Sequence, residues 1–116
     1  MLKFYGYDKC STCKNAEKLL LSKKIAFAKT DITETAPSRD ILKLALSQGY
    51  TLMDLFNKSG VQYRELNMKD KVKTMTEAEA LKLLSQNGRL VKRPIVTDGK
   101  NITVGFKEEL FQKMWR

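Results

Sequence analysis

The pattern of apolar and polar positions divides the chain into two strand-containing ends and a helical middle. The apolar run Leu2–Gly6 is typical of a strand, and Ala26–Ile32 alternates around Phe27 and Ile32 as a second strand would. Between them, the spacing of apolar residues over Ser11–Lys24 predicts a helix. A strand, a helix and a strand in this order favour a parallel strand pair joined by a right-handed crossover.

The middle of the chain, residues 37–88, has its own helix start and stop signals, and we call it the helical insert. Ser38 is a favourable N-cap for a helix that ends at Gly49. A second, short helix is predicted over Thr51–Ser59. Thr76–Glu79 has the sequence of a capping box, which predicts the start of a third helix.

Strand signals return after the insert. Pro94–Thr97 and Ile102–Val104 flank the turn signal Asp98-Gly99 and predict a β-hairpin with a two-residue type I′ turn. A closing helix is predicted over Lys107–Arg116. Its apolar face consists of Leu110, Phe111 and Met114. Without the insert, the order β-α-β, β-β-α is that of an α/β protein with a thioredoxin-like fold and a mixed four-stranded sheet.

The length of 116 residues suits one domain with a single core. We therefore expect one domain over residues 1–116, in which 1–36 and 89–116 form the thioredoxin-like core around the helical insert. No stretch suits a signal peptide or a membrane span, so we expect a cytoplasmic protein with no membrane partner. Cytoplasmic thiols are kept mostly reduced, and a cysteine pair there is more often catalytic or regulatory than structural.

The charged residues narrow the possible chemistry. The chain has 22 Lys and Arg, 13 Asp and Glu and no His, which gives a formal charge of +9. The lack of His excludes Ser-His-Asp and Cys-His sites, and a zinc site would need two further ligands beside the two thiolates, so no metal is expected. The basic excess indicates an anionic ligand, an acidic partner or nucleic acid. The alternative is a solvated surface of scattered lysines, because no basic run reaches five residues.

Cys10 and Cys13 form a Cys-x-x-Cys pair between the first strand and the first helix, the local pattern of thioredoxin-like redox chemistry. Cys10 is expected at the helix N-cap or just before it, where free N–H groups and the helix dipole favour a thiolate. Cys13, one turn inside, could resolve a mixed disulfide. Ser11 and Thr12 would add hydroxyls and N–H donors near the sulfur. Two structural alternatives stay open: a pair of buried apolar cysteines, or half of a metal site.

Basic residues supply further candidates for the site. Lys9 and Lys14 flank the cysteines and add a small attraction for a thiolate. Pro94 begins the third strand, and in a thioredoxin-like fold the proline at this position faces the cysteine loop through a peptide bond that is usually cis. Arg93 would then point its guanidinium at the same place. The alternative is a surface arginine and an ordinary trans proline. Arg64 stands in a predicted loop and by itself indicates only a solvated charge.

Four motifs together resemble the ArsC/Spx family of small cytoplasmic thioredoxin-fold proteins, and they cover nearly the whole chain in the family's order. They are Tyr7-x-x-Cys10-Ser11-Thr12-Cys13-Lys14, Leu55-Phe56-Asn57-Lys58-Ser59-Gly60-x-x-Tyr63-Arg64, Arg93-Pro94-Ile95-Val96 and Val104-Gly105-Phe106. The resemblance implies a thioredoxin-like sheet with the insert over the cysteine loop. It also implies Cys10 as the nucleophile, with Arg64 and Arg93 converging on an oxyanion beside it.

Two branches of this family imply different functions. In the arsenate reductases three arginines hold the oxyanion, and glutathione and glutaredoxin supply the electrons. Here Arg64 and Arg93 match two of the arginines, but no Arg stands at Val104–Phe106, where the third belongs. Cys13 and the Val-Gly-Phe motif are instead similar to the Spx/MgsR branch. Its Spx-type regulators bind the C-terminal domain of the RNA polymerase α subunit and switch on a Cys-x-x-Cys disulfide.

The sequence leaves three hypotheses in ranked order. The first is a thiol–disulfide redox protein in which Cys10 attacks an oxidised partner, or is itself oxidised, and Cys13 resolves it. It needs no bound cofactor, and a cellular thiol such as glutathione with glutaredoxin, or thioredoxin, would be the reductant. The second is a glutaredoxin-dependent arsenate reductase, and the third is a redox-controlled regulator on RNA polymerase. Direct nucleic-acid binding ranks last, because no element suited to reading a DNA groove is evident.

Overall fold

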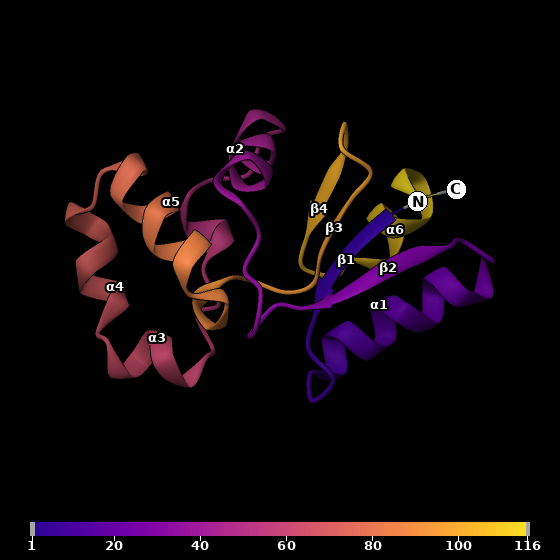
Figure 1. Cartoon of the computed structure of the whole chain (residues 1–116), viewed down its shortest axis with the longest axis horizontal. Coiled ribbons are helices and arrows are strands. Elements are labelled where there is room, and N and C mark those ends of the chain that lie inside the picture. The colour runs from indigo at the N-terminus through magenta and orange to yellow at the C-terminus, as the bar shows by residue number, and fades with distance from the viewer. Residues whose placement is uncertain (1, 116) are drawn as a thin grey trace.

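The computed structural model describes residues 2–115, in which two strand-containing ends enclose a run of short helices (Figure 1). The strands are β1 (Leu2–Gly6), β2 (Phe27–Asp31), β3 (Ile95–Thr97) and β4 (Ile102–Val104). The α-helices are α1 (Ser11–Ser22), α2 (Arg39–Ser47), α3 (Val61–Glu65), α4 (Met68–Lys71), α5 (Glu77–Gln86) and α6 (Glu108–Met114). Three 3₁₀ turns are η1 (Met53–Leu55), η2 (Val72–Thr74) and η3 (Gly88–Leu90).

The strands form one mixed sheet in the order β2-β1-β3-β4. Strands β1 and β2 are parallel, whereas β3 runs antiparallel to both β1 and β4. The predicted parallel strand pair and the thioredoxin-like sheet are therefore confirmed. Tyr5 of β1 pairs with Ile95 of β3, and Ile95 pairs with Val104 of β4. The carboxyl ends of β1 and β4 and the start of β3 consequently lie at the same end of the sheet.

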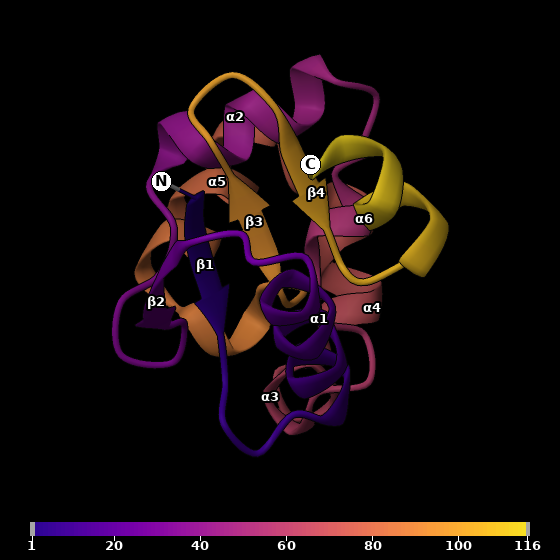
Figure 2. The same ribbon diagram turned by 90° about the vertical axis from the view of Figure 1, so that its right-hand side faces the viewer.

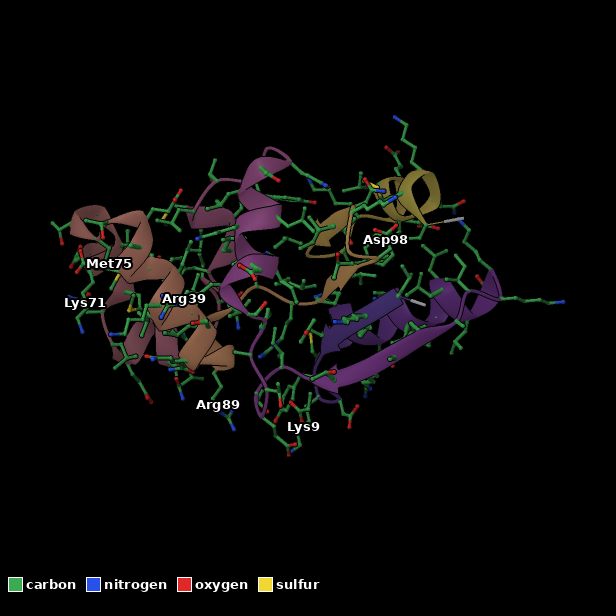
Figure 3. The ribbon with its side chains drawn as sticks, turned by 45° about the horizontal axis from the view of Figure 1, so that its top comes forward. Lys9, Arg39, Lys71, Met75, Arg89 and Asp98 are labelled. Atoms are coloured by element: carbon green, nitrogen blue, oxygen red, sulfur yellow. The ribbon has the colours of Figure 1, made fainter. Side chains whose placement is uncertain are left out.

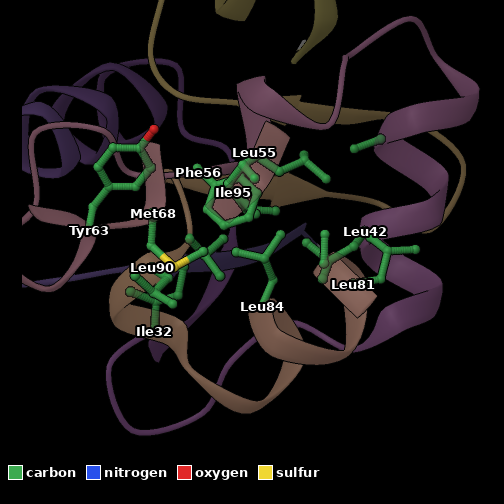
Figure 4. Close-up of a cluster of buried hydrophobic side chains, with 14 of the residues drawn as sticks. Ile32, Leu42, Leu55, Phe56, Tyr63, Met68, Leu81, Leu84, Leu90 and Ile95 are labelled. Atoms are coloured by element: carbon green, nitrogen blue, oxygen red, sulfur yellow. The ribbon is translucent and has the colours of Figure 1, made fainter. Parts of the chain in front are cut away.

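Helices cover both faces of the sheet. Helices α1 and α6 lie together on one side, and α2 to α5 gather on the other (Figures 1 and 2). Alternate residues of β3 divide between two buried clusters, as the two-residue period of a strand requires. Val96 packs in the cluster under α1 and α6, and Ile95 packs in the cluster of the helical insert (Figure 4).

Side chains from the end of α2 fasten the insert to the free edge of the sheet. The N–H of Ile102 donates to Oε1 of Gln48, and the N–H of Val104 donates to the hydroxyl of Tyr50, both at 3.2 Å. Unpaired N–H groups on an edge strand otherwise invite pairing with another chain. These bonds therefore protect β4 and hold the region after α2 against the end of the sheet.

Helix starts in the insert agree with their capping signals. The Ser38 hydroxyl accepts from the N–H of Ile41 at 3.3 Å, which confirms the predicted N-cap of α2. In the capping box of α5, Thr76 Oγ1 accepts from the Glu79 N–H and the Glu79 carboxylate accepts from the Thr76 N–H, both at 3.2 Å. These bonds satisfy N–H groups that a helix start leaves free.

A helix was predicted over Thr51–Ser59, but the structure has one 3₁₀ turn there, η1, and the rest of the prediction was wrong. Thr51 and Asp54 cap each other there, with the Thr51 N–H donating to the Asp54 carboxylate at 2.8 Å. The chain then extends, and Phe56 pairs with Val91 in an isolated antiparallel bridge. A long-range backbone pairing thus replaces the local helix in the second half of the segment.

The β3–β4 turn and the helix ends also differ from prediction. Thr97 pairs with Ile102, so the hairpin loop holds four residues and not two. Of these, only Gly99 has a positive φ, +96°, whereas a type I′ turn needs two such residues. The helices predicted to end at Lys24 and Arg116 end earlier, α1 at Ser22 and α6 at Met114; Arg116 itself lies outside the described residues.

Candidate functional site

Cys10 is the N-cap residue of α1. Its backbone is extended, with φ −103° and ψ 115°, and its Sγ accepts a hydrogen bond from the N–H of Cys13 at 3.4 Å. Its carbonyl accepts the first bond of the helix, from Lys14 at 3.1 Å. The side chain is half-buried, so the sulfur is reachable from solvent while it lies at the positive end of the helix dipole.

Cys13 lies one turn inside α1 and is fully buried. It packs with Phe4 and Ala16 in the cluster under α1 and α6. Burial, followed by the Cys10 side chain beside it, raises the pKa of the Cys13 thiol to about 12. Gly6 keeps this pocket open, because a Cβ at that position would lie 2.4 Å from a Phe4 ring carbon and 3.5 Å from the Cys13 sulfur. Cys13 is therefore held as a neutral thiol.

Cys10 has the opposite pKa behaviour. Burial raises its pKa, but hydrogen bonds from the thiol and the N–H of Cys13, together with the Arg93 guanidinium, outweigh burial. The pKa of Cys10 consequently lies below its ordinary value. Because the thiolate is the nucleophile, this shift activates Cys10 at neutral pH. The two sulfurs of the pair thus differ in protonation as well as in exposure.

Arg93 reaches the thiolate from the segment before β3. Its guanidinium acts on Cys10 both as a hydrogen-bond donor and as a positive charge. The guanidinium carbon lies 5.0 Å from the centroid of the Tyr7 ring, a cation–π contact. Tyr7 was assigned no role from the sequence, although its place three residues before Cys10 puts it in the same loop. The Arg93–Pro94 peptide bond is cis, as expected, and Pro94 is buried.

The side chains of the remaining candidates are not among the main influences on the pKa values of the two thiols. Arg64 was expected in a loop but lies on α3, where its side chain is exposed, and the main influences on the pKa values of the two thiols do not include it. The side chains of Ser11 and Thr12 are exposed at the first turn of α1, where a helix leaves its backbone N–H groups free, and their place in the site stays a prediction. Lys9 projects from the outer edge of the molecule (Figure 3), and the main influences on Cys10 do not include it.

Replacing Arg93 by alanine should raise the pKa of Cys10, because the variant loses a hydrogen-bond donor and a positive charge beside the thiolate. We expect alkylation of Cys10 at neutral pH to slow by roughly tenfold or less, the range of a partly exposed charge contact. The measurement is the rate of iodoacetamide labelling against pH. Arg64→Ala is the matched control and should leave the profile unchanged; equal shifts in both variants would contradict the assigned geometry.

The described part of the chain offers no alternative centre for metal chemistry. Among residues 2–115 no group of three or more Cys, Asp or Glu side chains is placed to hold a metal ion. Within the same range, none of the helices has the length and apolar character needed to cross a membrane. The chemistry that the site supports is nucleophilic attack by a sulfur, with a second sulfur in the next turn of helix.

Curated relatives cover nearly the whole chain. The uncharacterized protein YusI of Bacillus subtilis (strain 168) is 46% identical over 115 residues, which is 98% of this chain and 98% of the relative. The regulatory protein MgsR of the same organism is 30% identical over 106 residues, covering 90% of this chain and 82% of MgsR.

Solved structures agree with the fold. A putative ArsC family related protein from Bacteroides fragilis superposes with a TM-score of 0.90 and 40% identity, over 97% of this chain and 95% of the other. A possible arsenate reductase from Streptococcus mutans UA159 gives 0.88 and 34%, over 97% and 98%. The family model for the ArsC family matches residues 5–114. With the mixed sheet and the Cys-x-x-Cys helix start, these matches establish that the chain belongs to the ArsC family.

Proposed function

We propose that this protein catalyses or senses thiol–disulfide exchange through Cys10 and Cys13. The observation that carries the proposal is the asymmetry of the pair. Cys10 is half-buried with a lowered pKa, whereas Cys13 is buried with a pKa raised to about 12. An exposed thiolate beside a protected thiol suits a nucleophile and a resolving group.

The exchange has two steps. The Cys10 thiolate attacks one sulfur of an oxidised partner, a mixed disulfide forms, and the partner's other sulfur leaves as a thiolate. Cys13 then loses its proton to solvent or to the departing thiolate and attacks Cys10 Sγ, which releases the second partner sulfur. The partner disulfide is reduced to two thiols, and the Cys10–Cys13 pair is oxidised to one disulfide. Glutathione with glutaredoxin, or thioredoxin, would return the pair to its reduced state in the cytoplasm.

Mild oxidation tests this proposal. Reduced protein treated with a small disulfide should form an intramolecular Cys10–Cys13 bond, identified by mass spectrometry of proteolytic peptides, and dithiothreitol should reverse it. A matched sample unfolded in denaturant shows whether formation depends on the folded pair. Recovery of only intermolecular dimers, or of two free thiols, would contradict the proposal.

Arsenate reduction is a second candidate, supported by the likeness to the possible arsenate reductase from Streptococcus mutans UA159. An oxyanion at Cys10 would find the Arg93 guanidinium, whereas Arg64 is exposed on α3 and is not among the main influences on the pKa of the thiol. A single arginine would bind a multiply charged oxyanion only weakly. The test is a turnover assay with arsenate, glutathione and glutaredoxin, in which this candidate requires arsenite as product.

A regulatory role is a third candidate, and the 30% identity with the regulatory protein MgsR favours it. Such a role needs the Cys10–Cys13 switch but no turnover. The partner would be the C-terminal domain of the RNA polymerase α subunit. A pull-down with that domain, run on reduced and on oxidised protein, tests it, and absence of binding in both states would remove it.

A further inference from the structure

A pocket at the end of β4 has a composition that the cysteine chemistry does not explain. It has a volume of about 250 Å³ and lies between the segment around η1 and the segment that joins β4 to α6. Three lysines line it: Lys58, Lys92 and Lys107. Its other walls are largely apolar and include Phe56, Val104 and Leu110. A cationic rim over an apolar wall suits a small organic anion better than a bare inorganic ion.

The backbone around the pocket is fixed, so the lysines are brought together by the fold. The Lys92 N–H donates to the Leu55 carbonyl at 2.7 Å. The Lys92 side chain passes over Gly105, where a Cβ would lie 3.2 Å from the lysine Cε and crowd it. Gly105 also has a positive φ of +79°, which favours glycine. The turn after β4 therefore leaves room for the Lys92 stem on its way to the pocket.

The positive charge in this pocket exceeds the negative charge. Asp54 is the one carboxylate among the residues that line it, and its backbone and side chain are already bonded to Thr51. Lys58 and Lys107 are close enough to Asp54 to help keep its pKa low, after the larger effect of the Thr51 N–H. None of the three lysines forms an ion pair within residues 2–115. The pocket therefore carries positive charge that no ion pair within residues 2–115 neutralises.

The pocket and Cys10 share one end of the sheet. Val104, in the pocket wall, pairs with Ile95, and Ile95 pairs with Tyr5, just before the cysteine loop. Strand β3 lies between β4 and β1, so these two strands are two strand spacings, or about 10 Å, apart. Phe106, which directly precedes Lys107, packs against the buried cluster under α1 and α6, as Cys10 does. A molecule of small-peptide size bound at the pocket could therefore extend to the Cys10 sulfur.

The geometry points to a docking subsite for carboxylates, in which Lys58, Lys92 and Lys107 hold the anionic end of a small thiol or disulfide that exchanges with Cys10. This inference rests on the proposed thiol–disulfide function and assigns its substrate class. Low-molecular-weight thiols and disulfides that carry carboxylates would react faster than neutral ones of the same length. The reaction is the exchange already described, with the partner disulfide reduced and the Cys10–Cys13 pair oxidised.

Three disulfides of one acetylated tripeptide, Ac-Cys-Gly-Gly, that differ only in the charge of the C-terminus test the subsite: the free carboxylate (anionic), the amide (neutral) and the aminoethylamide (cationic). The readout is the rate of Cys10–Cys13 oxidation at low salt, expressed as the ratio of anionic to neutral. We expect Lys92→Gln and Lys107→Gln each to lower this ratio by about threefold, the scale of one exposed charge contact. Asp54→Asn should raise it, because the competing carboxylate is removed.

Lys71→Gln is the matched control for net charge. Lys71 is exposed on α4, at the far end of the insert from the sheet (Figure 3). The subsite is overturned if Lys71→Gln lowers the ratio of anionic to neutral rates as much as the pocket variants do, or if none of the variants lowers it. Binding of the peptide Ac-Ala-Gly-Gly, which has the same C-terminal carboxylate but no sulfur and cannot exchange, provides a separate readout. In NMR spectra, the changes in backbone amide chemical shift on binding should centre on Val104–Lys107. Such changes without any exchange would overturn the proposed function and leave the subsite standing. Absence of such changes would overturn the subsite.

Discussion

A Cys13→Ser variant is expected to accumulate a stable mixed disulfide between Cys10 and its oxidised partner. The first step needs only the Cys10 thiolate, but the second needs a sulfur that can attack it. Serine is nearly the same size and cannot carry out that attack, so turnover should fall by orders of magnitude while labelling of Cys10 continues. The measurement is intact-protein mass spectrometry after a small disulfide is added, which should show one adduct per chain.

Cys10→Ser is the opposite case and should form no adduct at all. Because Cys13 is fully buried, a serine there places a hydroxyl, which is more polar than the thiol, in an apolar cluster. Cys13→Ala avoids that hydroxyl and should trap the same adduct. Rapid loss of the adduct in both Cys13 variants, or an adduct on Cys13 in Cys10→Ser, would mean that the two roles are assigned the wrong way round.

Gly88→Ala is expected to destabilise the fold more than any other substitution of a single hydrogen by a methyl group in this chain. A Cβ on Gly88 would lie 1.6 Å from the carbonyl oxygen of Ile32. Ile32 cannot easily yield, because its side chain is buried and its N–H donates to the Gly6 carbonyl at 2.9 Å. We expect a loss of about 3 kcal/mol or more, a large share of the stability of a domain this size, measured by urea unfolding.

Gly60→Ala is the matched control. Its new Cβ would lie 2.7 Å from the amide nitrogen of the Asn57 side chain, a group that can rotate away, and the backbone φ there is −75°. We expect a change within about 1 kcal/mol. Equal stabilities of the two variants would show that the close approach of Gly88 to Ile32 is not a constraint on the fold.

The sequence predicted the sheet and the cysteine helix well because their signals are local. The strand Leu2–Gly6 was predicted with the bounds that the structure has. The helix starts at Cys10 and Ser38 could be predicted because each lies just before residues with the helical spacing of apolar positions. The capping box at Thr76 is equally local. Where the residues themselves dictate the backbone conformation, pattern and structure agree.

The misses depend on long-range contacts. Phe56 leaves the predicted helix because it pairs with Val91, more than thirty residues away, which no local pattern can indicate. Arg64 was expected in a loop but lies on α3, and its place beside the oxyanion, which the family resemblance implies, stays a prediction. The ring of Tyr7 under Arg93 likewise becomes visible only once β1 and β3 are side by side. The division into a sheet core and a helical insert stays a prediction, because Ile32 and Ile95 share a buried cluster with the insert.

The pH dependence of alkylation at Cys10 tests the central claim most directly. Because the pKa of Cys10 lies below its ordinary value, the thiolate and its labelling rate should rise at a lower pH than for a free cysteine, whose pKa is about 8.5. Cys13, buried with a pKa raised to about 12, should stay unlabelled until the protein unfolds. The predicted result is that only Cys10 is labelled, and that its labelling rate reaches its plateau at a pH below the midpoint for free cysteine. A Cys10 that reacts no faster than a free thiol at neutral pH would contradict the account.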